Sequence, residues 1–213
     1  VLGLFGNKAG SRDMQICLAH GYGVDKQERC KNTLASVQAL LGGQSIELYV
    51  EIPLDGIGAL NDLLGGVTVT LLDDFTASDP TMTAGKTLTL TGQQAEILVR
   101  SRMSMAVGTN EARMSRQRIF MDAAVPMIRE RISENSGFAS EMLDSLSPYL
   151  TTNMVRGRMI NELNKAYHYD VQPVEYLTGE HTIGDDGFVE FHAASQSAVD
   201  FVLSAFYTKM DAQ

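Results

Sequence analysis

The chain has 213 residues, of which 44% are hydrophobic and 20% charged, and its formal net charge is -9. This composition is that of an ordinary globular protein and excludes a disordered or fibrous one. An acidic chain lacks the broad basic stripe that general nucleic-acid binding needs, so we exclude that class of partner. No apolar run reaches the roughly 18 residues of a transmembrane helix.

The first part of the chain predicts alternating helices and strands. The expected elements, in order, are a short apolar segment over 14–23, a helix over 28–41, a strand over 46–52, a helix over 55–64 and a strand over 67–72. Gly42 and Gly43 should end the first helix, and Asp55 could cap the second. Val67, Val69 and Leu71 alternate and should share one face of the last strand.

A polar loop over 73–86 separates this strand from the next elements. A brief strand over 87–90 leads to Thr91, which is a plausible N-cap for a helix over 92–100. After a loop over 103–109, Asn110 should cap a long helix over 111–133, which Pro126 should bend. The apolar stripe expected on this long helix comprises Met114, Met121, Val125, Ile128 and Ile132.

The remaining residues continue the same alternation. The expected elements are a helix over 138–148, a helix over 154–167 with Asn153 as its cap, a strand over 171–178 and a helix over 195–209. Such alternation predicts an α/β fold, an α-β-α sandwich in which helices cover a central mixed sheet. Because no linker, repeat or low-complexity segment interrupts it, we expect one domain over residues 1–213.

Arginines are concentrated in one stretch of this acidic chain. Residues 100–118 read RSRMSMAVGTNEARMSRQR and hold five of the chain's eleven arginines, with one carboxylate. The guanidinium group matches phosphate or carboxylate oxygens two at a time. A local cluster of this kind in an acidic chain is typical of a site for a small anion.

The predicted helix places these cations on one side. Arg113 and Gln117 are four residues apart and share a face, and Arg116 lies beside them. The positive end of the helix lies close to them. If the preceding segment folds back, Arg100 and Arg102 complete a cradle suited to a pyrophosphate. The alternative is a solvated charged face, although such faces usually mix both signs of charge.

Phosphate chemistry commonly uses a divalent metal held by carboxylates. Asp62 precedes a Gly-Gly turn and Asp74 follows the strand after that turn, so a chain reversal could bring them together. We therefore consider a Mg²⁺ site, or a Mn²⁺ site, at Asp62 and Asp74. Either residue considered alone is more typical of a surface or capping position.

Several motifs resemble the LytR-CpsA-Psr family of Gram-positive cell-envelope enzymes. LNDLLGGVTVTLLDDF at 60–75 is similar to the family's "VDalGGV…DF" segment, and LTLTGQQAEILVRSR at 88–102 is similar to "L.GeqALaYvRtR". NEARMSRQR at 110–118 resembles "DfgRt.RQ", and HGYG with the following helix at 20–41 resembles "ayayGG". The resemblance is clear over about residues 14–130.

The resemblance implies a phosphotransferase that attaches anionic glycopolymers, such as wall teichoic acid or capsular polysaccharide, to peptidoglycan from a polyprenyl-pyrophosphate carrier. It implies a location on the extracellular face of the membrane, with an anchor outside this chain. It also implies Mg²⁺ at Asp62 and Asp74, and a catalytic role for these two and for Arg113. The positions that match its pyrophosphate-binding residues are Arg100, Arg102, Arg113, Arg116 and Gln117.

Two departures from the family pattern keep a second hypothesis open. Asn110 stands where the family usually has Asp, and the family's amino-terminal strands, with a Ser-x-Pro-Arg-Asp segment, have no counterpart here. The alternative is a non-catalytic module that binds polyprenyl pyrophosphate or a wall polymer. The family's older label, transcriptional attenuator, implies DNA binding, which the charge argues against.

The two cysteines, Cys17 and Cys30, fit either a pair of buried apolar residues or a single disulfide. The extracellular location implied by the resemblance favours the disulfide. Reduction of such a bond adds two hydrogens, about two daltons of intact mass.

Overall fold

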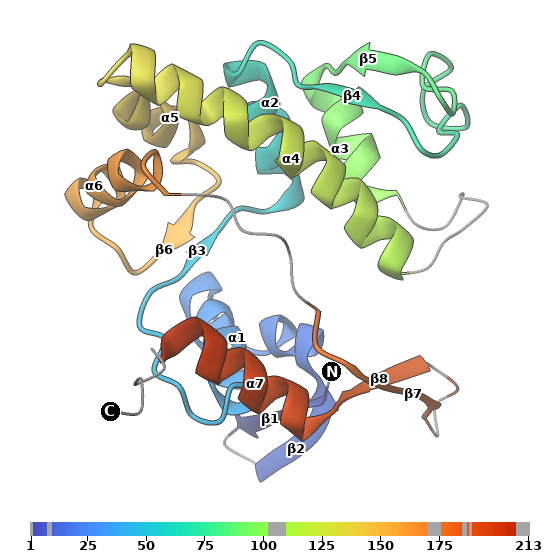
Figure 1. The fold of residues 1–213 in the computed structure, drawn as a ribbon, viewed down its shortest axis with the longest axis vertical. Helices are drawn as coiled ribbons and strands as arrows, with labels where there is room; N and C mark the ends of the chain where they lie inside the picture. Colours follow the sequence, from blue (N-terminus) through green and yellow to red (C-terminus); the bar gives the residue numbers. More distant parts are fainter. Residues whose placement is uncertain are drawn as a thin grey trace, which may run out of the picture. The chain divides into compact units, whose positions relative to one another are not determined.

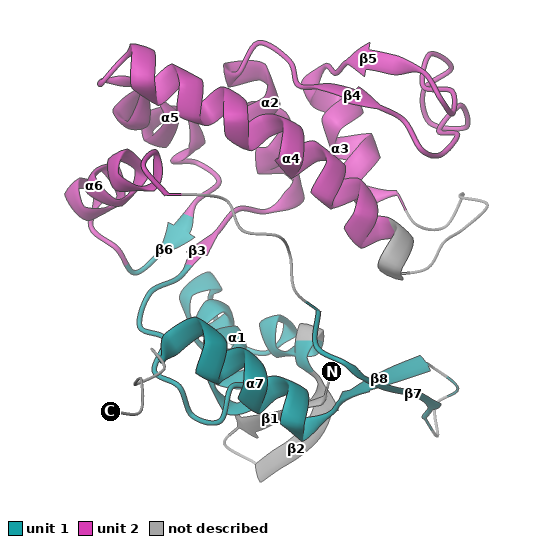
Figure 2. Ribbon diagram, in the orientation of Figure 1, with its two compact units in different colours: residues 1–49, 151–153, 171–213 teal, residues 50–150, 154–170 magenta. Residues whose placement is uncertain are grey.

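The computed structural model describes residues 2–7, 10–101, 110–169, 176–184, 187 and 189–207. Its contacts divide the chain into two compact units, which Figure 2 colours separately. Unit 1 contains residues 1–49, 151–153 and 171–213, and unit 2 contains residues 50–150 and 154–170. Unit 1 is assembled from three segments of the chain, so no linker marks the division in the sequence. The expected single domain stays a prediction, because units defined by contacts need not fold separately.

Unit 1 combines hairpins with helices (Figure 1). Its elements are β1 (Leu2–Asn7), β2 (Gly10–Gln15), the 3-10 helix η1 (Ile16–Gly21), α1 (Lys26–Leu40), β6 (Thr151–Thr152), β7 (Gly179–Ile183), β8 (Val189–Ala193) and α7 (Ser195–Phe206). Strands β1 and β2 pair antiparallel, as do β7 and β8. Asp25 caps α1 by accepting a hydrogen bond from the Glu28 amide at 2.8 Å.

The buried thiol of Cys30 lies on α1. The side chain of Cys17 lies outside the described residues. A disulfide between the two therefore stays a prediction, and intact mass before and after reduction would test it.

Unit 2 surrounds the larger apolar core. Its elements are β3 (Val50–Glu51), α2 (Leu54–Leu63), β4 (Thr68–Thr70), β5 (Thr87–Thr89), α3 (Gly92–Arg100), α4 (Asn110–Glu134), α5 (Phe138–Leu146) and α6 (Arg156–Ala166). The antiparallel β4–β5 hairpin pairs Val69 with Leu88. Val67, Val69 and Leu71 turn inward as predicted, being 0%, 4% and 1% exposed.

The core of unit 2 joins the hairpin to its helices. The buried members of this cluster include Leu60, Leu64, Val67, Val69, Leu71, Phe75, Met82, Leu90, Leu98, Phe120, Phe138, Met142 and Leu146. Asn61 connects the helices to the hairpin, because its amide donates to the Leu90 carbonyl at 2.8 Å and accepts from the Val67 amide at 2.9 Å. The end of α2 is thereby fixed to both strands.

Helix α3 begins as the sequence predicts. Thr91 is its N-cap and forms a capping box with Gln94, in which each side chain bonds the other residue's amide. The helix ends at Arg100, with Ser101 as its C-cap. Arg100 is therefore the last residue of α3.

The buried stripe of α4 agrees with the predicted one only in the second half of the helix, where Ile132 belongs to the core and Ile128 packs against it. In the first half, Met114 and Met121 are 41% and 43% exposed, whereas Phe120 and Ala124 are fully buried. Arg116 lies in the same buried stripe, one helical turn before Phe120. A charged residue in that stripe concealed it from a search for apolar periodicity, so the prediction chose the two methionines instead.

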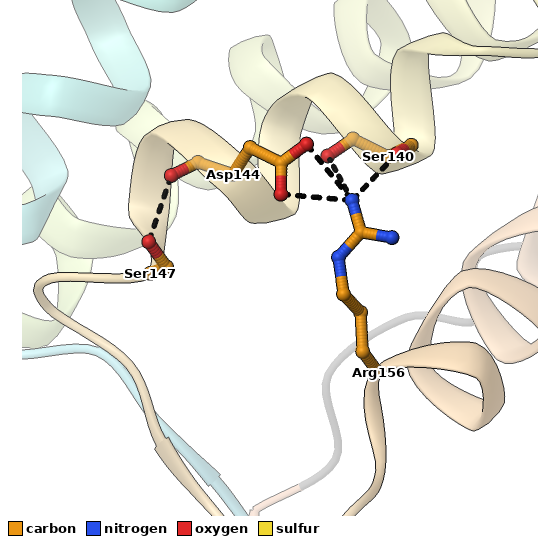
Figure 3. A network of polar contacts seen from close by, with 4 residues as sticks. All are labelled: Ser140, Asp144, Ser147 and Arg156. Atoms are coloured by element: carbon orange, nitrogen blue, oxygen red, sulfur yellow. Dashed lines mark hydrogen bonds and ion pairs between the residues drawn. The ribbon is translucent and has the colours of Figure 1, made fainter.

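An exposed polar network links α5 to α6 (Figure 3). Arg156 Nη2 donates to both carboxylate oxygens of Asp144 at 2.8 Å and to Ser140 Oγ at 2.6 Å. Both charged side chains are more than half exposed. Exposed ion pairs contribute little to stability, about 1 kcal/mol or less, so this network orients the two helices more than it stabilises them.

Several expected details differ from the structure. Asp55 lies in the first turn of α2, whose N-cap is Pro53. Asn153 does not cap α6, because its side chain instead donates to the Glu47 carbonyl and accepts from the Tyr49 amide.

The α/β class is confirmed, but the strands of the described residues pair two by two rather than in one central sheet. Alternation identifies a strand and does not specify its partner. Most of the strand expected over 171–178 lies outside the described residues, and the β7–β8 hairpin that follows was not predicted.

Candidate functional site

The arginine-rich stretch spans the junction between α3 and α4, which pack against each other in unit 2 (Figure 1). Arg100 is the exposed last residue of α3, and Arg113 is half-buried near the start of α4. Arg102 lies outside the described residues. Arg118 pairs with Asp122 along the surface of α4 at 3.1 Å. Of the two described arginines at this junction, Arg100 is therefore the more exposed.

Arg116 is buried, with 1% of its side chain exposed. Its Nη1 donates to Asp73 Oδ2 at 2.8 Å and its Nη2 donates to the Ser101 carbonyl at 2.7 Å. Its Nε is also buried and has no hydrogen-bond partner. These contacts do not fit the prediction that Arg116 lines an open pyrophosphate cradle, because both terminal nitrogens already contact the protein.

Gln117 holds the same end of α3. Its Nε2 donates to the Val99 carbonyl at 3.3 Å, and its side chain is half-buried. Arg116 and Gln117 thus bond the carbonyls on either side of Arg100. The structure brings Arg100, Arg116 and Gln117 together, as the sequence predicted, but the last two contact α3 itself.

Asp73 was not among the predicted site residues, although the sequence contains a signal for it. The inward-facing residues in and next to β4 are Val67, Val69 and Leu71, and the same alternation of burial continues beyond the strand to Asp73 and to the buried Phe75. Asp73 is 24% exposed, which agrees with an inward position. Strand alternation therefore distinguishes Asp73, which pairs with Arg116, from its neighbour Asp74.

Asp74 faces outward and closes a local turn. Its Oδ1 accepts hydrogen bonds from both the amide and the hydroxyl of Thr76. The Thr76 hydroxyl, followed by the Thr76 amide, lowers the pKa of the Asp74 carboxyl below its usual value. Asp74 is therefore ionised at neutral pH, but one of its two oxygens is already engaged.

Asp62 lies at the other end of α3. A Cβ on Gly92, the first residue of α3, would lie 2.5 Å from Asp62 Oδ2. Asp73, in contrast, reaches the C-cap of α3 through Arg116. Nine helical residues separate these ends, which corresponds to about 13 Å at the usual helical rise.

The surroundings of Asp62 and Asp74 differ. Asp62 contacts the start of α3, whereas Asp74 directly follows the residue that is tied to its end. The described side chains contain no group of three or more histidines, cysteines or carboxylates that could hold a metal. A Mg²⁺ or Mn²⁺ site at Asp62 and Asp74 stays a prediction, and we derive no chemical step from a metal.

Arginines further along α4 repeat the contact made by Arg116. Arg131 Nη2 donates to the carbonyl of Leu64, the C-cap of α2, at 3.3 Å. Arg129 Nη2 donates to the carbonyl of Tyr167, the C-cap of α6, at 3.0 Å. Cations at helix C-termini satisfy open carbonyls and oppose the negative end of the helix dipole. Some arginines of α4 thus hydrogen-bond the carboxyl ends of the neighbouring helices.

The LytR_cpsA_psr family model matches residues 11–201. The chain therefore belongs to the LytR-CpsA-Psr family, whose members transfer glycopolymers in the cell envelope. No curated protein matched the chain in sequence. Within the described residues, no helix combines the length and apolar character needed to cross a membrane.

Solved structures share the fold. The structure of gbs0355 from Streptococcus agalactiae has a TM-score of 0.75 at 20% identity, over 96% of this chain and 71% of that one. TagV from B. subtilis has a TM-score of 0.69 at 19% identity, over 98% of this chain and 80% of that one. TagT, bound to LI-WTA, has a TM-score of 0.68 at 19% identity, with 96% and 75% covered.

Proposed function

We propose that the protein transfers an anionic glycopolymer from a polyprenyl-pyrophosphate carrier to peptidoglycan, at the extracellular face of a membrane. Family membership supports glycopolymer transfer in general. The ligand LI-WTA on TagT supports wall teichoic acid as a substrate class. The observation that carries the proposal is the α3–α4 junction. There Arg116 and Gln117 of α4 hold the end of α3, which carries the exposed Arg100, and Arg113 lies one turn before them on α4.

The chemistry follows from the charge that develops during transfer. An acceptor hydroxyl of peptidoglycan attacks the phosphorus linked to the glycopolymer, and its proton leaves. The bond from that phosphorus to the polyprenyl phosphate breaks, which yields a phosphodiester and free polyprenyl phosphate. Arg100 and Arg113 would neutralise the pyrophosphate and stabilise the charge on the leaving phosphate. Arg102, outside the described residues, is the third candidate.

Binding of a short polyprenyl pyrophosphate, measured by calorimetry, tests the ligand class. Arg100→Ala and Arg113→Ala should each weaken binding by about 1–3 kcal/mol, the usual contribution of a hydrogen bond to a charged group. Arg118→Ala is the matched control, because it removes the same charge from the same helix while its partner Asp122 is exposed. Equal losses in all three variants would indicate general electrostatic attraction and contradict the assigned site.

A requirement for Mg²⁺ or Mn²⁺ stays a prediction. Calorimetric titrations with and without chelator would test it, and Asp62→Asn and Asp74→Asn should be compared one at a time. If one carboxylate serves a metal, one variant should lose the metal response and the other should keep it. Unchanged binding in chelator would contradict the requirement.

A second candidate function is a binding module without turnover. Asn110 favours it, since a neutral amide in place of the family's usual Asp cannot serve as a base. Release of polyprenyl phosphate from a lipid-linked glycopolymer in the presence of peptidoglycan distinguishes the two functions. Binding without release would support the module, and release that Arg113→Ala abolishes would support the transferase.

A further inference from the structure

Arg116 carries a positive charge in the interior of unit 2. A buried charge is costly unless it is paired and hydrogen-bonded. Here a carboxylate and a carbonyl, Asp73 Oδ2 and Ser101 O, accept from its two terminal nitrogens at 2.8 and 2.7 Å. The guanidinium group therefore connects α4 to the end of α3 and to the loop that follows β4.

The contact lies directly beside Arg100, a candidate pyrophosphate-binding residue. Ser101 is the residue after Arg100, and Val99, the residue before it, is held by Gln117. Two successive residues of α4 thus fix the carbonyls that flank Arg100. Because these bonds hold the backbone on both sides of Arg100, they also fix the direction of its Cα–Cβ bond and so the point from which its side chain extends.

We propose that Arg116 is a positioning residue of the anion site, which acts through Asp73 and Ser101 to fix the last turn of α3 and so to orient Arg100. It does not itself contact the pyrophosphate. This inference rests on the proposed function for its ligand, but its structural half concerns only contacts within unit 2.

An arginine suits this position because its planar fork reaches two acceptors at once. A lysine presents a single nitrogen and cannot span a carboxylate and a separate carbonyl in the same way.

Asp73→Asn distinguishes a positioning role of Arg116 from direct contact between Arg116 and the pyrophosphate, because the two roles predict different changes in affinity. If Arg116 positions Arg100, the loss of the Asp73 charge loosens the end of α3 and weakens binding of farnesyl pyrophosphate about tenfold, as Arg116→Met also does. If Arg116 instead contacts the pyrophosphate directly, Asp73→Asn frees its guanidinium group for the pyrophosphate, and binding stays equal or becomes tighter. That second result would overturn the proposal. Arg118→Met controls for the lost charge and should change the affinity by less than about threefold.

A double-mutant cycle with Arg100→Ala tests whether Arg116 acts through Arg100. Coupled residues show non-additive effects, whereas independent ligands show additive ones. Once Arg100 is absent, Arg116→Met should weaken binding by less than about threefold. A further tenfold loss in that background would show an independent contact and would overturn the proposal.

Hydrogen exchange tests the structural half without any ligand. Amides over residues 97–101 should exchange faster in Arg116→Met and in Asp73→Asn than in Arg118→Met, and the increase there should be larger than the increase in α5. Unchanged exchange at 97–101 would overturn the proposal even if binding is lost. If the unmodified protein binds no farnesyl pyrophosphate, the proposed function fails, and this measurement still decides the positioning role.

Arg116→Lys provides a second variant if Arg116→Met does not fold. It keeps the charge beside Asp73 but replaces the two separated terminal nitrogens of the guanidinium group by a single nitrogen. It should fold, exchange faster at residues 97–101 and bind farnesyl pyrophosphate more weakly than the unmodified protein. If hydrogen exchange at residues 97–101 and the affinity of this variant equal those of the unmodified protein, the planar guanidinium group is not needed at this position.

Discussion

Gly92 is required at its position by contact rather than by backbone conformation. A Cβ there would lie 2.5 Å from Asp62 Oδ2 and 2.9 Å from the Gly58 carbonyl. Both neighbours belong to α2, so the two helices approach each other closely at this point. The absence of a side chain allows α3 to begin against α2.

Gly92→Ala should therefore destabilise the protein, by about 1–3 kcal/mol as is usual for overpacking. The backbone of Gly58 cannot move aside as a flexible side chain could. Chemical denaturation would measure the change in the free energy of unfolding. Gly157→Ala is the matched control, because a Cβ at this helical glycine of α6 meets nothing within 4 Å. It should stabilise by up to about 1 kcal/mol, and equal effects of the two substitutions would contradict the contact.

Asp79 should contribute a pH-dependent stabilisation to the loop before β5. The Thr81 hydroxyl, then the Thr81 amide and the Gln94 side chain, donate to its carboxylate and lower its pKa. A lowered native pKa means that this stabilisation is present above the unfolded value of about 3.9. It is lost as the pH falls through the lower native value.

Thr81→Val removes the largest cause of that shift and should raise the pKa of Asp79 toward its usual value. NMR titration of the Asp79 carboxyl would measure this change. Thr83→Val is the control, since Thr83 lies in the same loop and does not contribute to the shift. An unchanged pKa of Asp79 in Thr81→Val would assign the shift to the remaining donors.

At the scale of elements, α4 supports three other helices through its arginines. Arg116, Arg129 and Arg131 donate to the C-cap carbonyls of α3, α6 and α2. These contacts are unequal, because Arg116 is buried and paired with Asp73, whereas Arg131 is exposed.

The free energies of unfolding of two variants should reflect this difference. Arg116→Met leaves Asp73 without its partner in a partly buried place and should cost about 3–5 kcal/mol. Arg131→Met removes one hydrogen bond to a carbonyl and should cost about 0.5–1.5 kcal/mol. Urea denaturation would measure both. Similar losses of unfolding free energy in the two variants would show that burial of the Arg116–Asp73 pair does not determine how much it stabilises the protein.

The sequence predicts the positions of α3, α4 and the strands β4 and β5 well, because these elements carry local signals, but it does not predict that the two strands pair. Thr91 with Gln94 marks the start of α3, and alternating apolar residues mark β4. Tertiary contacts were harder to foresee. The sequence predicts Arg116 at the candidate site, but charge alone does not reveal that its side chain is buried and paired with Asp73. The roles of Arg116 and Asp74 toward a ligand or a metal stay predictions.

At the scale of the whole molecule, the two units differ in how their helices are buried. None of the side chains of α7, all of which are described, is buried, and Leu203 and Phe206 on it are 53% and 47% exposed. Helix α3 is shorter but has buried Ala95, Leu98 and Val99. Burial of this kind supplies most of the stability of a helix.

Amides of α7 should therefore exchange with solvent much faster than those of α3, by about a hundredfold or more. Hydrogen exchange followed by mass spectrometry would compare the two helices in one sample. Both are short and lie in the same chain, so each serves as the control for the other. Equal protection would mean that α7 gains stability from contacts other than burial of its side chains.

The three capped helix ends along α4 also limit how the molecule can move. A shift of α4 along its own axis by one turn, about 5.4 Å, would separate Arg116, Arg129 and Arg131 from their carbonyls at once. Sliding of this helix would therefore break three contacts together. If a substrate causes a rearrangement of unit 2, we expect α2, α3, α4 and α6 to move together, with adjustment around the ligand made by the exposed side chains.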